Sequence, residues 1–254
     1  MQIWVFAGFF CRIIFPAQKH ARSGDLRSFF ADRTKFGHKE YATLGRYMMQ
    51  AEAIDFIFSI AVLIMSVVIH EVSHGVAANS LGDPTAKYEG RLTLNPLKHL
   101  DPFGSVFLPI FTYAIGGFIF GWAKPVPYNP YNLRNQKWGP AVVSIAGPAS
   151  NIFIALVFSL ALRSFADLAT TALFQISAMI ILINILLAVF NLVPIPPLDG
   201  SKVLFAFLPT GWYQLQFFLE QYGFLALLVF ILLFWPYVLP VVFYLFRLFT
   251  GVTL

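Results

Sequence analysis

The sequence predicts an all-α membrane protein, a polytopic helical bundle of about four to six transmembrane segments. Two observations support this prediction. Charged residues make up only 11% of the 254 residues, against about 25% in an average soluble domain, and the hydrophobic 58% fall in long runs rather than short alternations. So few charges cannot cover a water-facing surface, which excludes a soluble globule. A disordered chain is excluded too, because disorder needs low hydrophobicity.

The first 50 residues differ from the rest in charge. They hold eight lysines and arginines against three acidic residues, whereas the rest of the chain is balanced. A basic segment beside a bilayer attracts anionic lipid, so this charge indicates the lipid bilayer as a partner and no nucleic acid. The apolar run Ile3–Phe15 is too short to span a membrane. We therefore treat residues 1–50 as a basic N-terminal extension that need not belong to the native fold, and residues 51–254 as the membrane domain.

The first long apolar run, residues 54–81, predicts one continuous membrane helix. Gly82 and Pro84 mark its end, because glycine adopts the left-handed cap and proline cannot continue a helix. A polar stretch, residues 84–102, follows. Within it residues 86–94 alternate in polarity, so we expect a small membrane-associated β element there, with an edge that an extended peptide can join.

The remaining apolar runs predict a hairpin and further spans. Residues 103–122 are broken by Pro109 and by two glycines, which favours a re-entrant hairpin over a crossing. Residues 141–165 and 171–193 are joined by a turn of about five residues, so we expect antiparallel neighbours. Three prolines follow residue 193, and irregular backbone at membrane depth must line a cavity or pack in protein. Residues 224–249 predict a last span, bent near two prolines.

The first predicted span contains the pentad His70-Glu71-Val72-Ser73-His74. On a helix, this spacing puts both imidazoles on one face, one turn apart, with a carboxylate beside them, which is typical of a zinc site. The alternative is structural, with each histidine bonded to a neighbouring carbonyl. Two histidines and a glutamate inside a span would cost several kcal/mol without compensation, which favours the metal site.

A catalytic zinc ion needs a third protein ligand and one open position. We predict Asp199 as this ligand, because it is the only acid between Asp167 and Glu220 and stands at the end of a span beside proline-broken backbone. The alternative is a turn aspartate preceding Gly200. The prediction is one Zn²⁺ per chain.

The position of the metal site also predicts which side of the membrane it faces. If one ion joins the pentad to Asp199, the first helix and the span ending at residue 193 leave the membrane on the same side. Residues 103–122 must then re-enter rather than cross. The polar stretches on both sides of that run carry three lysines or arginines each, which the positive-inside rule makes cytoplasmic. We therefore expect a multi-pass protein of the cell membrane with its site toward the cytoplasm.

Five stretches of this sequence together resemble the site-2 protease family of intramembrane zinc metalloproteases. They are His70–His74, Gly90–Pro96, Gly121–Pro127, Gly147–Asn151 and Asn191–Gly200. No stretch free of spans after Met48 is long enough to hold an inserted PDZ domain. The chain therefore resembles the compact bacterial type of the family.

The resemblance implies an intramembrane zinc-dependent endopeptidase that hydrolyses peptide bonds in or near transmembrane helices of substrate proteins. It also implies that His70, His74 and Asp199 bind Zn²⁺ and that Glu71 activates the attacking water. Asn191 and Asn151 are expected to hold the substrate backbone or the developing oxyanion. Judged from the residues alone, Asn151 fits equally well in a seam of small residues with one hydrogen bond between helices.

Two other functions compete with this one. A transporter also has broken helices and intramembrane polar residues, but it predicts two similar halves, which the sequence lacks. A non-cleaving relative that acts as a membrane scaffold has no need of Glu71 between two metal ligands. Without an inserted domain to gate the site, we expect a regulatory membrane protein or a second copy of the chain as a further partner.

Overall fold

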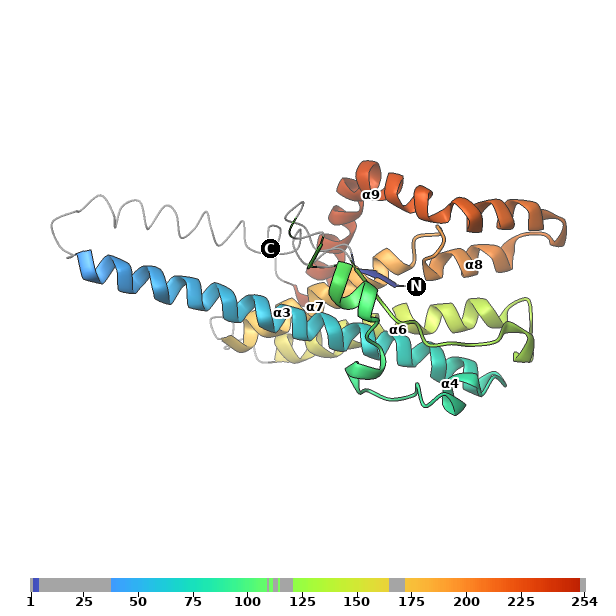
Figure 1. The fold of residues 1–254 in the computed structure, drawn as a ribbon, viewed down its shortest axis with the longest axis horizontal. Helices are drawn as coiled ribbons and strands as arrows, with labels where there is room; N and C mark the ends of the chain where they lie inside the picture. Colours follow the sequence, from blue (N-terminus) through green and yellow to red (C-terminus); the bar gives the residue numbers. More distant parts are fainter. Residues whose placement is uncertain are drawn as a thin grey trace. The chain divides into compact units, whose positions relative to one another are not determined.

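The computed structural model describes residues 2–4, 38–108, 110–111, 114, 121–164 and 172–251. Among these residues, four helices are long and apolar enough to span a membrane, as in a multi-pass membrane protein. They lie in α3 (His38–Ser80), α6 (Gly139–Ser164), α7 (Ala172–Asn191) and α9 (Tyr213–Thr250), all labelled in Figure 1. The predicted helical membrane fold is confirmed.

The other described elements are short. They are α4 (Thr85–Tyr88), η1 (Pro96–Lys98), η2 (Pro102–Phe107), η3 (Pro130–Asn132), α8 (Asp199–Phe207), η5 (Thr210–Trp212), and the paired strands β1 (Gln2–Trp4) and β2 (Gly121–Ala123). The strand expected over residues 86–94 is wrong, because α4 occupies its first part. The Asp83 carboxylate accepts hydrogen bonds from the N–H and the hydroxyl of Thr85, which favours a helical turn at that point.

Helix α3 begins at His38, earlier than the predicted start at residue 54. Residues 38–53 include three alanines, two glutamates and two methionines, which favour helix even where the sequence is no longer apolar. Its C-terminal end lies where the sequence places it. Gly82 has a φ of 109°, and the N–H of Asp83 returns to the Ala78 carbonyl at 2.9 Å, so the last turn is closed by a left-handed glycine.

The described residues divide into two compact units. The first contains residues 62–100 and 123–254, and the second contains residues 101–122 together with the beginning of α3. In the second unit, the hydroxyl of Ser105 donates to the Trp122 carbonyl at 2.7 Å, and the rings of Phe103 and Trp122 lie 5.8 Å apart. The two ends of the 103–122 run therefore meet, as a re-entrant hairpin requires. Residues 109, 112–113 and 115–120 lie outside the described part of this run.

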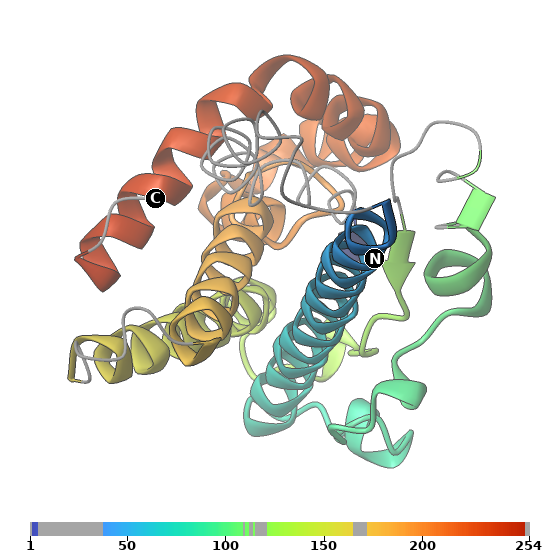
Figure 2. The same cartoon turned by 90° about the vertical axis from the view of Figure 1, so that its left-hand side faces the viewer.

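In the first unit, α6 is the central helix. It packs on α7, α8 and α9, and Figure 2 shows α6 and α7 running side by side. The buried face of α6 carries small side chains at helical spacing, including Ser144, Gly147, Ala155 and Ser159. Small residues let neighbouring backbones approach closely, which is the usual way in which helices pack in lipid.

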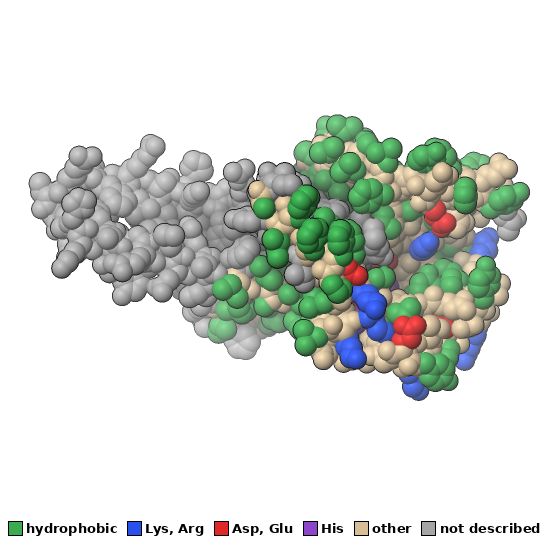
Figure 3. Space-filling view, in the orientation of Figure 1, with side chains coloured by type: hydrophobic (Ala, Val, Ile, Leu, Met, Phe, Trp, Pro, Cys, Tyr) green, Lys and Arg blue, Asp and Glu red, His purple; other side chains and the backbone are tan. Residues whose placement is uncertain are grey.

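Helix α9 contains Pro236 and Pro240, and Figure 1 shows that its axis changes direction in its C-terminal half, as predicted. Hydrophobic side chains cover the outer face of α9 in Figure 3, and Leu232, Leu233 and Tyr237 are among the exposed ones. Large exposed apolar side chains along a span are what contact with lipid acyl chains requires.

Candidate metal centre and active site

Helix α3 supplies three of the predicted site residues within little more than one turn. His70, Glu71 and His74 are all buried, with exposed fractions of 0%, 2% and 9%. The centroids of the two imidazole rings lie 4.6 Å apart, which is the closeness that a separation of four residues gives on a helix. His70, Glu71 and His74 thus share a buried face of α3.

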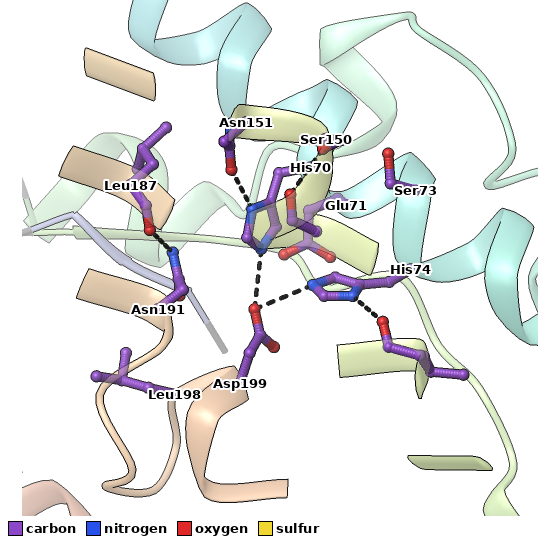
Figure 4. A network of polar contacts seen from close by, with 12 residues as sticks. His70, Glu71, Ser73, His74, Ser150, Asn151, Leu187, Asn191, Leu198 and Asp199 are labelled. Carbon is purple, nitrogen blue, oxygen red and sulfur yellow. Dashed lines mark hydrogen bonds and ion pairs between the residues drawn. The ribbon is translucent and has the colours of Figure 1, made fainter. Parts of the chain in front are cut away.

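Asp199 comes from a different part of the chain. It is the first residue of α8 and follows Leu192–Leu198, a non-helical segment closed by turns such as the hydrogen bond from Leu198 N to Ile195 O. Its Oδ2 lies 3.0 Å from Nε2 of His70 and 3.2 Å from Nε2 of His74, as Figure 4 shows. One ligand atom from each of the three residues lies within 4.8 Å of the others. The structure thus brings together the three predicted metal ligands.

The hydrogen bonds of the two imidazoles test whether this cluster suits a cation. Nδ1 of His74 lies 2.7 Å from the main-chain carbonyl of Val143, and Nδ1 of His70 lies 2.5 Å from Oδ1 of Asn151. A carbonyl oxygen only accepts, so Nδ1 of each ring carries a hydrogen and Nε2 of each ring faces Asp199. Nε2 of His74 is buried without a hydrogen bond. Two nitrogen lone pairs and a carboxylate turned toward one another fit a metal ion, and this donor set is one that zinc prefers.

Gly147 on α6 has no side chain, and the two imidazoles occupy the space beside it. A Cβ atom at this position would lie 2.5 Å from Nε2 of His74 and closer still to Nε2 of His70. Any side chain there would push both rings out of place. The glycine of the Gly147–Asn151 stretch is therefore part of the construction of the site.

Glu71 is buried beside the two imidazoles, and Figure 4 shows its carboxylate next to both rings. Its Oε2 accepts a hydrogen bond from the main-chain N–H of Val126 at 2.8 Å. Val126 belongs to the segment after β2, and the guanidinium of Arg91 holds that segment by donating to the carbonyls of Lys124 and Pro125 at 2.9 and 3.1 Å. The loop that holds the Glu71 carboxylate is thus itself held in place by Arg91.

The two asparagines predicted to hold substrate differ in their surroundings. Asn151 is completely buried, and its amide is bonded to His70, Asn184 and the Ser66 carbonyl, as in the packing-seam alternative. Asn191 is buried at the end of α7, and its Nδ2 donates to Leu187 O on its own helix at 2.8 Å. A contact of either residue with substrate stays a prediction.

Several residues that support the site were missed in the sequence. They are Ser66, Arg91, Val126, Val143 and Asn184. Asn184 and Ser66 carried a signal, because polar side chains inside an apolar span need a hydrogen-bond partner. Val126 and Val143 carried none, since they act through main-chain groups that every residue type except proline shares.

Comparison with known proteins agrees with this geometry. The family model described as Peptidase family M50 matches residues 160–234. Two curated relatives, each named "Putative zinc metalloprotease", are YwhC of Bacillus subtilis and Rip2 of Mycolicibacterium smegmatis. YwhC is 38% identical over 179 residues, which cover 68% of this chain and 78% of the relative. Rip2 is 34% identical over 174 residues, which cover 68% of this chain and 66% of the relative. No solved structure matches the chain significantly.

Proposed function

Because this chain belongs to peptidase family M50, the site-2 proteases, and is a zinc metalloprotease, we propose that it is an intramembrane endopeptidase. It hydrolyses peptide bonds in or near the transmembrane helices of substrate proteins. The observation that carries this proposal is the convergence of His70, His74 and Asp199 beside the buried carboxylate of Glu71. Their place among helices able to span a membrane supports chemistry within the bilayer.

One Zn²⁺ per chain would be held by Nε2 of His70, Nε2 of His74 and a carboxylate oxygen of Asp199. When bound, the ion polarises the scissile carbonyl and lowers the pKa of a water molecule. The imidazoles suit this role because Asn151 and Val143 each hold an Nδ1 hydrogen, which leaves Nε2 of both rings for the ion.

Glu71 is the general base and then the general acid. The hydrogen bond from Val126 holds Oε2, so Oε1 is the oxygen that accepts the proton of the attacking water. Glu71 returns this proton to the leaving amine when the peptide bond breaks. Its place between two ligands on one helical turn keeps the carboxylate in reach of the reacting atoms.

Asn191 contributes to substrate binding. It stands where α7 ends and the non-helical segment before Asp199 begins, so its amide lies beside the backbone that a substrate would approach. Releasing the hydrogen bond to Leu187 would free Nδ2 for a substrate carbonyl or the developing oxyanion. A substrate helix must unwind to expose its scissile bond, so helix-breaking residues are expected there.

The site faces the cytoplasm. The described polar segments next to it expose Lys87, Lys98, Lys124, Arg134 and Lys137, and Figure 3 shows basic side chains around the region of α4. The positive-inside rule assigns such segments to the cytoplasmic side. Residues 51–254 form the protease domain, with residues 1–50 as a basic extension. Its partners are transmembrane substrates and the bilayer, together with a regulatory membrane protein or a second copy of the chain.

Elemental mass spectrometry of the detergent-purified protein tests the metal site first. We expect about one zinc per chain in the wild type and clearly less in Asp199→Ala, since two imidazoles alone make a weak site. The second test is cleavage of a reporter membrane protein whose single transmembrane helix contains helix-breaking residues. A well-folded wild type without zinc, or one that leaves a panel of such reporters intact, would contradict the proposal.

A further inference from the structure

A buried chain of polar side chains leads from His70 into the helical core. Asn151 on α6 donates through Nδ2 to Oδ1 of Asn184 on α7 at 2.8 Å. Asn184 in turn donates to the hydroxyl of Ser66 on α3 at 3.0 Å. All three side chains are buried, and both asparagines have an exposed fraction of 0%. Three spans thus meet in one hydrogen-bond network that ends on a candidate metal ligand.

Main-chain carbonyls set the direction of this network. Nδ2 of Asn184 donates to Ile180 O at 2.8 Å, and because a carbonyl cannot donate, the amide nitrogen of Asn184 faces its own helix. Oδ1 of Asn184 therefore faces Asn151, which must present Nδ2 to Asn184 and Oδ1 to His70. An amide oxygen only accepts, so Nδ1 of His70 carries the ring hydrogen.

We propose that Asn184 is a positioning residue of the metal site, which acts through Asn151 to fix the tautomer of His70. A hydrogen held on Nδ1 leaves Nε2, which lies 3.0 Å from Oδ2 of Asp199, as the ring nitrogen available to a metal ion. This inference rests on the proposed function, because the tautomer of His70 matters only if His70 binds a metal ion. It also assigns Asn151 to support of a ligand rather than to contact with substrate.

The two histidines reach the same state by different routes. His74 gives its Nδ1 hydrogen directly to the Val143 carbonyl, which is present whatever residue stands at 143. His70 depends on the Asn151 amide, which is oriented by Asn184 at 2.8 Å and by the more distant Ser66 carbonyl at 3.4 Å. Both side-chain amides can be removed by substitution. The second route therefore makes His70 the ligand that is sensitive to a distant residue on α7.

Packing alone does not account for an asparagine at position 184. Its neighbours Ile183 and Ile185 are buried apolar residues of a strongly apolar span. A leucine would fill such a position without the cost of placing an amide in an apolar interior. The amide is stabilised there by its hydrogen bonds, and those to other helices connect it to Asn151 and Ser66.

Zinc affinity, measured by competition with a chromogenic chelator in detergent, tests the proposal. The variants are Asn151→Leu, Asn184→Leu and the double variant. We expect Asn184→Leu to weaken zinc binding about tenfold and Asn151→Leu about 10- to 100-fold, the range for residues that orient a metal ligand. Because both act on His70 through one path, the double variant should bind zinc no more weakly than Asn151→Leu.

The position of the ring hydrogen on His70 is a second observable, and measuring it needs no metal. In zinc-free protein with ¹⁵N-labelled histidine, the two ring nitrogens of His70 differ in chemical shift according to which carries the hydrogen, and a His70→Gln variant assigns the signals. We expect Nδ1 of His70 to carry its hydrogen in the wild type, whatever the state of Nε2, and to lose it in part of the Asn184→Leu molecules. Loss of packing alone would not change which nitrogen is protonated.

Ile185→Ala is the matched control, because it creates a cavity at a neighbouring buried position of α7 without removing a hydrogen bond. We expect it to lower the melting temperature while leaving zinc affinity and the His70 tautomer unchanged. The inference is overturned if Asn184→Leu keeps the wild-type tautomer, or if the losses of the two single variants multiply in the double variant. A wild type that binds no zinc overturns the proposed function instead, and the tautomer measurement still decides the inference.

Discussion

The main-chain N–H of Val126 donates a 2.8 Å hydrogen bond to Oε2 of Glu71, so the segment after β2 reaches the carboxylate inside the pentad. A buried carboxylate needs such a donor, because burial without a hydrogen bond costs a charged group far more than a neutral one. The bond also restricts the rotation of the carboxylate. The candidate base therefore has a defined direction as well as a defined position.

Replacement of Glu71 by glutamine should separate metal binding from chemistry. The amide keeps the shape of the side chain but cannot accept a proton, so we expect cleavage of the reporter to fall by about 10²- to 10⁴-fold. Zinc content should stay near that of the wild type, because His70, His74 and Asp199 remain. Elemental analysis and cleavage are measured on the same preparation, with Glu89→Gln at an exposed position as the control. Comparable cleavage by Glu71→Gln would remove Glu71 as the base.

Arg91→Lys should slow cleavage without loss of zinc. The guanidinium donates to the carbonyls of Lys98, Lys124 and Pro125, a reach that a lysine ammonium cannot reproduce. The loop that holds Glu71 would shift, and misplacement by about 1 Å costs up to about 10²-fold in rate. Arg134→Lys, on an exposed arginine, is the matched control. A cleavage rate equal to that of the wild type would show that Arg91 does not position the loop.

Gly147→Ala should disrupt the metal centre through a single methyl group. The new Cβ would lie within 2.5 Å of the His74 ring, so the two imidazoles must move apart from Asp199. We expect zinc content well below one per chain and loss of cleavage. Gly211→Ala introduces the same methyl group where nothing lies within 4 Å, and it should leave zinc content unchanged. Full zinc occupancy in Gly147→Ala would contradict the close approach described here.

Asp83 should make the loop beside α3 sensitive to acid. Burial of its carboxyl opposes ionisation, but hydrogen bonds from Thr85, Asn132 and the Asn129 N–H outweigh it and hold the pKa of Asp83 below its usual range. A lowered folded-state pKa contributes stability that is present above the unfolded-state value of about 3.9 and is lost as the pH falls through the folded-state value. In the wild type, we expect the melting temperature in detergent to decrease once the pH is below about 4.

The Asp83→Asn variant isolates this contribution. Its amide can accept fewer of these hydrogen bonds and brings two donors against existing donors, so the variant should melt at a lower temperature at neutral pH. The difference from the wild type should shrink as the pH falls, because protonation of Asp83 weakens the same bonds. A difference that stays constant as the pH falls well below about 4 would exclude the carboxylate as the cause.

The spans could be predicted because long apolar runs are typical of membrane-spanning helices. Helices α6, α7 and α9 were expected from hydropathy and prolines, and the end of α3 from Gly82. The start of α3 was not, because residues 38–53 form helix by propensity without the apolarity that marks a span. The strand expected over residues 86–94 was wrong because alternation of polarity over a few residues does not outweigh the hydrogen bonds from Thr85 to Asp83.

The candidate ligand set could also be predicted from the sequence. The pentad fixes two donors on one helical face, and Asp199 was the only acid left in the right part of the chain. The surrounding shell was harder to foresee, because Val126 and Val143 contribute main-chain groups. Asn184 was visible as an amide in an apolar run, but only the packing of α6 on α7 shows that Asn151 is its partner.

The site is assembled from one fixed part and one adjustable part. The pentad residues keep their mutual spacing for as long as α3 remains a helix, so base and imidazoles cannot drift relative to one another. Asp199 is placed by the non-helical stretch before α8, whose backbone has no regular helical spacing. Sequence change in Leu192–Leu198 can therefore tune how strongly the third ligand engages while the geometry of the other groups is preserved.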